Sequence, residues 1–331
     1  MLDNSTSWKR YFKFSPVTPL IFSENQAINY FVKRDILDEE PNNMESLWIL
    51  PKVISLFNKQ QKDGSWKYSG ARKDISSQMI YNQIETYRII RVLVEKYGLN
   101  NTNDEISKAC EFLFSFQTEE GDFRGIYGNE YTPNYSAAIM EMLIKAGYEK
   151  DDRIDLGIKW LMSIRQNDGG WAIPFRTTKH KINYVFNEND KNAPIKNDPL
   201  KPSSHLITGI VLRAFASHNH YKKSIEAKRA GNFLKSQFFK KDNYPDRGTT
   251  DYWEKLAYPF WWTDIVSSLD SLSKLQFNPK DSDIKKGLEY LIDNQRSDGT
   301  WKVYYGLPKD DNNDLWINLA ICRIFKRFYS I

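Results

Sequence analysis

Two stretches of the sequence decide the fold: GIKWLMSIRQNDGGW at residues 157–171 and GLEYLIDNQRSDGTW at residues 287–301. Each runs through a helix-like pattern to a Gln, then to an Asp-Gly pair and a Trp. The same phrase, an acidic residue and Gly, any residue and then an aromatic, follows Gln60 and Gln117. The aromatics of the four copies are Trp66, Phe123, Trp171 and Trp301. Recurrence at intervals of roughly 50 residues, or multiples of it, indicates a repeat architecture.

Each copy predicts an outer helix, a turn and an inner helix. Before each turn, apolar residues recur three to four positions apart, as at Ile284, Leu288 and Leu291. The Asp-Gly pair ends that helix, because Gly readily takes the positive φ that helix ends need. The helices that follow are more apolar, which predicts that they form an inner set. They are expected at residues 76–97, 132–147, 203–218, 261–276 and 311–328, with one more helix at 24–35.

This alternation predicts an all-α fold, a single α/α toroid of about five to six helical hairpins with inner and outer helix rings. A closed ring is favoured, because very apolar inner helices must bury both flanks, although an open solenoid gives a similar pattern. The Gln and the aromatic of each turn are expected to staple neighbouring hairpins together. Residues 43–331 are assigned to the toroid, and residues 1–42 to an N-terminal strap, extended over Phe14–Ile21, and a leading helix that packs on the barrel.

Composition indicates an ordinary globular protein. Of 331 residues, 40% are hydrophobic and 27% charged, and no apolar run approaches a membrane span. The net charge of +5 is mild and no Lys/Arg stripe appears, so no nucleic-acid partner is expected. Cys110 and Cys322 have apolar helical neighbours and are predicted to be buried thiols. With no signal peptide apparent at the N-terminus, these features predict a cytoplasmic location. Oligomeric state stays open.

The Gln-to-aromatic turns resemble the QW repeats of squalene–hopene and oxidosqualene cyclases, and the related repeats of protein prenyltransferase β subunits. Besides the two stretches quoted above, ACEFLFSFQTEEGDF at residues 109–123 is similar. The resemblance spans about residues 45–328 and implies the α/α toroid. The sequence lacks the DxDDTA and DCTAE strings that carry the acid of those cyclases. It has no Asp-x-Cys, and its four His form no convincing metal set with the two Cys, so neither a metal nor a cofactor is expected. Zinc-dependent prenyl transfer is therefore disfavoured.

All the turns lie at the end of the ring where the inner helices start. Two long connections, residues 172–202 and 238–260, fall at the same end and are expected to shape a binding mouth. The polar and aromatic side chains near the inner-helix starts are the predicted substrate-binding residues: Tyr81, Asn82, Asn134, Tyr135, Phe260, Trp261, Trp262 and Trp316.

Asp264 is the first candidate for a catalytic acid. It follows Pro259 and three aromatics, and burial one turn into an apolar helix would raise its pKa and keep it protonated. Alternatively, it bonds the free N–H groups of its own helix. The further catalytic candidates are Glu85, Asp314 and His205. Glu85 could instead pair with Arg88 or Arg91, and His205 could be a hydrogen-bonded core residue.

The resemblance implies a terpene cyclase-like protein, an enzyme of isomerase or lyase type. It would act on an isoprenoid or other long apolar substrate in an aromatic-lined central cavity, by protonation from a buried carboxylate. Its aromatics would stabilise developing positive charge. The alternatives are a non-catalytic toroid that binds a lipid or a peptide, and a polysaccharide-active α/α-barrel enzyme. The expected partner is a small apolar ligand, and a peripheral membrane contact that supplies lipid substrate stays open.

Overall fold

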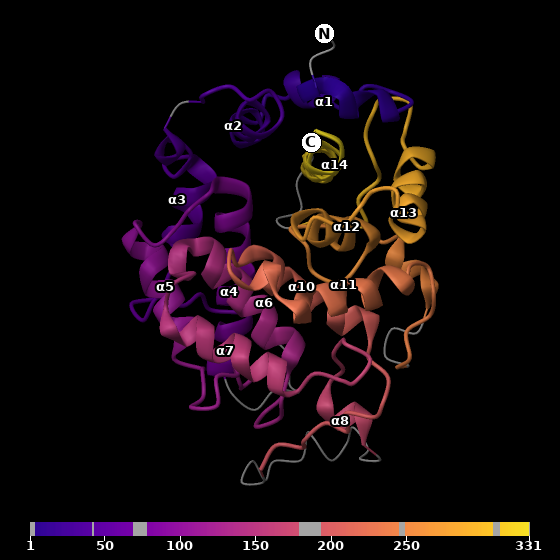
Figure 1. Cartoon of the computed structure of the whole chain (residues 1–331). Coiled ribbons are helices and arrows are strands. Elements are labelled where there is room, and N and C mark those ends of the chain that lie inside the picture. Colours follow the sequence, from indigo (N-terminus) through magenta and orange to yellow (C-terminus); the bar gives the residue numbers. More distant parts are fainter. Residues whose placement is uncertain are drawn as a thin grey trace.

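The computed structural model describes residues 4–41, 43–68, 78–178, 193–244, 249–306 and 312–330, and the fold is all-α (Figure 1). The inner helices are α2 (Gln26–Asp35), α4 (Gln78–Tyr97), α6 (Pro133–Leu143), α10 (His205–Ser217), α12 (Ile265–Lys274) and α14 (Asn313–Tyr329). The outer set comprises the 3-10 helix η1 (Asn4–Tyr11), α3 (Pro51–Phe57), α5 (Asp104–Phe114), α7 (Asp152–Ser163), α11 (Ile225–Ser236) and α13 (Ser282–Asp293).

Short elements connect these helices. They are α1 (Thr18–Ile21), η2 (Met44–Leu47), the π-helical turn η3 (Ile144–Tyr148), α8 (Pro174–Thr177), η4 (Tyr221–Lys223) and η6 (Thr250–Trp253). Two short strands, β1 (Ala257–Tyr258) and β2 (Tyr305–Gly306), pair in parallel, with Ala257 opposite Tyr305. The connections before α4 and α14 lie partly outside the described residues, as does the predicted loop 172–202.

The inner helices form a closed ring. Each contacts the next from α4 through α6, α10 and α12 to α14, and α2 contacts both α14 and α4. In Figure 1 the yellow α14 accordingly lies beside the indigo α2. Helices α6 and α10 bury nearly every residue, whereas the outer helix α5 keeps a polar face with Glu105 and Glu111. The open solenoid is thereby excluded, and the structure is the predicted α/α toroid.

The Gln of each of the first two turns fastens its hairpin to the next. Gln60 Nε2 donates to the carbonyl of Glu105 in α5 at 2.8 Å, and Gln117 Nε2 donates to that of Arg153 in α7 at 2.7 Å. The turns also approach the next outer helix closely. At Gly121, where φ is +105°, a Cβ would lie only 2.7 Å from the Leu156 carbonyl oxygen. Only Gly suits such a position, which explains its recurrence in every turn.

The Trp of three of the turns anchors its hairpin internally. The indoles of Trp66, Trp171 and Trp301 donate to carbonyls near the end of the preceding outer helix, those of Leu56, Leu161 and Leu291. Those carbonyls belong to the last turn, where intrahelical donors run out. The residues of the repeated turn are therefore structural, as the sequence predicts.

The N-terminal segment packs on α14. Phe14 N donates to Gln295 Oε1, and Asn318 Nδ2 donates to the Pro16 carbonyl at 2.9 Å. The sequence predicts an extended strap over Phe14–Ile21, but Thr18–Ile21 forms one helical turn, α1, in which Pro19 is the second residue. Proline is tolerated there because the first turn has no intrahelical acceptor for its missing N–H. The segment thus takes the place of an outer helix beside α14.

Candidate ligand-binding site

A pocket of about 140 Å³ opens where the inner helices start, and we call it the turn-end pocket. Its walls come from α4, α6 and α10, from the segment before α12, and from the two long connections. The lining residues are Tyr87, Tyr127, Asn134, Tyr135, Ala138, Ile173, Arg176, Ser204, Leu206, Ile207, Ile210, Asp242, Tyr244, Trp261 and Trp262.

Aromatic rings dominate the wall. The rings of Tyr127 and Tyr135 lie 5.8 Å apart, and those of Tyr87 and Trp261 also lie 5.8 Å apart. The Trp262 indole donates to the Lys255 carbonyl at 2.8 Å, which fixes that ring in place. Such a wall offers apolar area and π faces to a ligand.

Four of the predicted binding residues meet in this pocket. They are Asn134 and Tyr135 at the start of α6, and Trp261 and Trp262 before α12. Among the lining residues that the prediction missed are Tyr87, which lies deeper in α4, and Tyr127, Arg176 and Asp242, which lie in connections without a periodic pattern. The sequence predicts that the two long connections shape the mouth, but it gives no sign of which of their side chains face inward.

Asp264 does not line the turn-end pocket. Helix α12 begins at Ile265 rather than at residue 261, so Asp264 is its N-cap instead of standing one turn inside it. Its Oδ1 accepts from Ser267 N at 2.7 Å and its Oδ2 from Ala257 N at 3.0 Å, and the residue is fully buried. Burial raises the pKa of Asp264 to about 6 even though these hydrogen bonds oppose the rise. The geometry is that of the capping alternative.

The other three catalytic candidates lie apart from one another. Glu85 pairs with Arg88 at 3.2 Å and lines a groove beside α3. Asp314 pairs with Arg296 at 3.0 Å and accepts from Val303 N. His205 is buried next to the pocket, stacked on Trp253 with ring centroids 4.6 Å apart.

His205 is held by a carboxylate of the pocket wall. Its Nδ1 lies 3.3 Å from Asp242 Oδ2, yet burial lowers the His205 pKa, which favours the neutral ring. Asp242 also accepts from Ser204 Oγ at 2.8 Å, Leu206 N at 3.1 Å and Tyr244 N at 3.0 Å. These contacts fix the position of the Asp242 carboxylate in the pocket wall.

The remaining predicted binding residues pack elsewhere. Tyr81 stacks on Tyr68 at 5.0 Å, and Asn82 accepts from Tyr68 N. Trp316 is 1% exposed and stacks on Tyr258 at 5.8 Å. Phe260 faces a different cavity, at the far end of the inner helices. None of these four lines the turn-end pocket.

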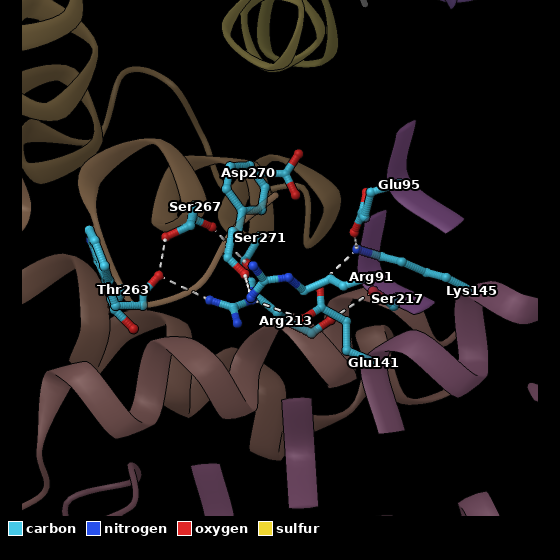
Figure 2. Close-up of polar contacts among 12 residues, drawn as sticks. Arg91, Glu95, Glu141, Lys145, Arg213, Ser217, Thr263, Ser267, Asp270 and Ser271 are labelled. Atoms are coloured by element: carbon cyan, nitrogen blue, oxygen red, sulfur yellow. Dashed lines mark hydrogen bonds and ion pairs between the residues drawn. The ribbon is translucent and has the colours of Figure 1, made fainter. Parts of the chain in front are cut away.

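Charged side chains fill the middle of the ring, where the sequence predicts an aromatic-lined cavity (Figure 2). Arg213 Nε donates to Glu141 Oε2 at 2.9 Å, and its Nη1 donates to the Trp262 carbonyl at 3.1 Å. Arg91 donates to the Phe260 carbonyl and lies 4.2 Å from the centre of the Trp261 ring. The two arginines are 1% and 2% exposed. The two arginines therefore contact Trp261 and Trp262, which form one wall of the turn-end pocket. The aromatic pocket is confined to the end of the ring where the inner helices start.

Every described helix is too short or too polar to cross a bilayer. No group of three or more His, Cys, Asp or Glu side chains in the described ranges has an arrangement that could hold a metal ion.

The chain has similarities to known proteins. The family model of the squalene-hopene cyclase C-terminal domain matches residues 78–189. Among solved structures, an alpha-amylase from Clostridium perfringens is 14% identical with a TM-score of 0.40, and 86% of each chain is covered. A protein from Actinoplanes is 12% identical with a TM-score of 0.41, covering 86% of this chain and 87% of that one.

A type II terpene cyclase from Scytonema is 12% identical with a TM-score of 0.35, covering 86% of this chain and 98% of that one. No curated protein matches the sequence. Identities of 12–14% to solved structures carry no information about activity. The function is therefore inferred from the chemistry of the pocket.

Proposed function

We propose that the turn-end pocket of this squalene–hopene cyclase-like α/α toroid binds the apolar end of an isoprenoid-type ligand. The observation that carries the proposal is the pocket wall, which combines the aromatic side chains of Tyr87, Trp261 and Trp262 with the aliphatic side chains of Ile207 and Ile210. Wall residues of this kind favour a branched hydrocarbon or an aromatic group.

The pocket volume limits what can enter. An apolar cavity of about 150 Å³ holds one benzene molecule, and the turn-end pocket measures about 140 Å³. It therefore suits a single five-carbon unit rather than a whole triterpene. Pockets that enclose drug-sized ligands start at about 300 Å³. We infer that a longer chain would insert only its end, with the remainder outside the pocket.

One polar group favours a ligand with a hydroxyl. The Oδ1 atom of Asn134 is buried and, among the described residues, has no hydrogen-bond donor. A buried acceptor left unpaired costs about 1–3 kcal/mol, and a ligand O–H would relieve that cost. An isoprenoid alcohol is consequently a better probe than a pure hydrocarbon.

Catalysis initiated by Asp264 is the second candidate. In its favour, burial raises the pKa of Asp264 to about 6, so a sizeable fraction is protonated near that pH. Against it, both carboxylate oxygens accept backbone N–H groups, and Asp264 is not a lining residue of the pocket. Incubation with squalene and with prenyl diphosphates, comparing wild type with Asp264→Asn, separates the two candidates. Turnover that disappears in Asp264→Asn would favour catalysis over binding.

Binding is tested with farnesol, followed by the intrinsic tryptophan fluorescence, to which the pocket residues Trp261 and Trp262 contribute. Ala138 lines the pocket and is 5% exposed, so Ala138→Leu pushes added carbon atoms into the pocket. We expect saturable binding to wild type, weakened at least about tenfold in this variant because overpacking excludes the ligand. The matched control is Ala216→Leu, since Ala216 is also 5% exposed on an inner helix but faces a cavity at the opposite end.

Equal affinity in Ala138→Leu and wild type would refute the pocket as the site. Absence of saturable farnesol binding to the wild type would refute the ligand class. Mass spectrometry of compounds that copurify with the protein adds an independent check, with an isoprenoid lipid as the expected finding.

A further inference from the structure

A second cavity, of about 730 Å³, lies at the opposite end of the ring, where α10, α12 and α14 finish. We call it the basic cleft. Its described lining residues include four cations, Lys145, Lys222, Lys274 and Arg327, and no acidic residue. Ser217, Ser273 and Gln276 add neutral hydrogen-bonding groups.

The carboxylates behind the cleft do not balance its cations. Asp270 is shared, because it accepts from Lys274 at 2.7 Å and also from Arg327. Glu95 and Glu141 both accept from Lys145, and Glu141 accepts from Arg213 as well. Counted with Lys222 at the rim and with the buried Arg213 that shares Glu141, the group holds five cations and three carboxylates. Figure 2 shows Lys145, Arg213 and the three acids.

The excess positive charge in the basic cleft acts on the pKa of Lys274. Burial lowers the pKa of Lys274, and the neighbouring Lys145 and Arg327 lower it further although Asp270 opposes them. Charges that lie partly out of water interact more strongly than those on an open surface. An anion in the cleft would relieve this repulsion.

The arrangement also leaves donors available. In the described part of the chain, Arg327 uses Nε for Ser273 Oγ at 2.8 Å and Nη2 for Asp270, which leaves Nη1 for a ligand. Lys274 spends one of its three N–H groups on Asp270. Arg and Lys in combination are the usual donors to oxyanions.

A simpler explanation covers part of the cluster. Cations in the last turn of a helix stabilise the helix dipole, and Lys274 and Arg327 occupy such positions in α12 and α14. Lys222 does not fit this explanation, because it lies in the short turn η4 and its own contact is to the exposed Asn219. Its position at the rim of the same cavity indicates a role in the cleft.

We propose that the basic cleft binds a small multivalent oxyanion, of phosphate or carboxylate class, through Lys145, Lys274 and Arg327 with Lys222 at the rim. Its walls and its end of the ring differ from those of the turn-end pocket. The proposal therefore stands independently of isoprenoid binding.

Isothermal titration of the full chain at constant ionic strength tests it, with inorganic pyrophosphate and citrate as separate probes. We expect saturable binding of one equivalent of at least one probe, and the probe that binds tells phosphate from carboxylate. Lys222→Ala should weaken that binding by about three- to tenfold, and Lys222→Glu by more, because a rim charge is removed or reversed. Both substitutions lie on a half-exposed turn, so the fold should be retained, which circular dichroism verifies.

Lys59→Ala is the matched control, because Lys59 lines another lysine-rich groove beside α3. It should leave the affinity unchanged. Loss of affinity in Lys59→Ala equal to that in Lys222→Ala would show diffuse charge attraction and overturn the proposal. Failure of both probes to saturate, or unchanged affinity in Lys222→Glu, would overturn it too. Ala138→Leu should retain oxyanion binding, which keeps this test separate from that of the turn-end pocket.

Discussion

Arg213 shows how a charged side chain is kept inside the ring. It is 2% exposed, on a helix whose other inward residues are mostly apolar. Its partner Glu141 comes from α6 and also accepts from Lys145 at 2.6 Å. Taking ions out of water costs several kcal/mol each, so the group is tolerable only while each charge keeps its partners. These contacts hold the pKa of Glu141 down to about 2 despite burial, so the carboxylate is ionised at neutral pH.

Arg213→Met should therefore lower the free energy of unfolding by about 3–5 kcal/mol, because it leaves Glu141 short of one buried partner. Urea denaturation at pH 7 measures the change. The control is Lys285→Met, whose pair with Glu289 is 3.6 Å long and mostly exposed. That change should cost less than about 0.5 kcal/mol. Similar losses in the two variants would contradict the account of the buried network.

Asp264 gives a prediction about pH. Its pKa rises from 3.8 to about 6 on folding, so the native state holds a proton over that range that the unfolded state releases. Stability from this group is then present below pH 3.8 and lost as the pH rises to 6, by an amount on the order of 3 kcal/mol. Asp264→Asn retains a capping oxygen but cannot ionise. The unfolding free energy of wild type relative to Asp264→Asn should fall between pH 4 and pH 7, whereas parallel pH curves would argue against the shift.

At the scale of elements, the hairpin with its turn is the unit that repeats. Gln117 Nε2 donates both to Gly121 O within its own turn and to Arg153 O of the next hairpin. A degenerate copy of the repeat lies near Gln237, at the end of α11. Among the described residues it lacks this arrangement, because Gln237 Nε2 donates only to Ser236 Oγ at 3.0 Å. The contacts between hairpins are thus unequal around the ring.

Gln117→Ala should cost about 1–3 kcal/mol of unfolding free energy, because the Arg153 and Gly121 carbonyls lose a partly buried donor. Gln237→Ala is the natural comparison and should cost well under about 1 kcal/mol. Thermal unfolding followed by circular dichroism measures both. A larger loss in Gln237→Ala than in Gln117→Ala would show that the turns do not join the hairpins in this way.

The start of α12 illustrates what an apolar pattern can and cannot predict. Trp261 and Trp262 continue the apolar run, so periodicity alone extends the helix back over them. The actual start is set by the capping box, in which Asp264 accepts from Ser267 N and Ser267 Oγ accepts from Asp264 N. Because α12 begins four residues later than the apolar pattern predicts, Asp264 is the N-cap of the helix and not an acid within it. It left the two Trp in an irregular segment from which they reach the pocket.

Over the whole molecule, the repeated turns were sufficient to predict the toroid and the end at which Asn134, Tyr135, Trp261 and Trp262 meet. They could not predict the charged centre. Arg213 and Glu141 lie 72 residues apart, and each is an isolated charge within an apolar helix, so no local pattern pairs them. Nor could they show the basic cleft, whose cations come from the ends of different helices and from η4. These contacts join helices that are distant in the sequence and form only when the ring closes. The spacing of the repeats does not determine which side chains then meet.

At the scale of the whole molecule, the N-terminal segment is expected to stabilise the closed ring. The N-terminal segment covers α14 with Trp8 and Leu20, both fully buried, and it bonds Gln295 and Asn318. Deletion of residues 1–24 should lower the free energy of unfolding by on the order of 5 kcal/mol, because each large apolar side chain contributes about 1.5–3 kcal/mol.

A synthetic peptide of residues 4–24 should restore the thermal midpoint of the truncated protein in a concentration-dependent way, since a ligand that binds only the folded state stabilises it. The same peptide with Trp8→Ala should restore less, because it lacks a buried anchor. Full stability of the truncated protein without peptide would mean that α14 does not need this cover and that the ring holds through α2 alone.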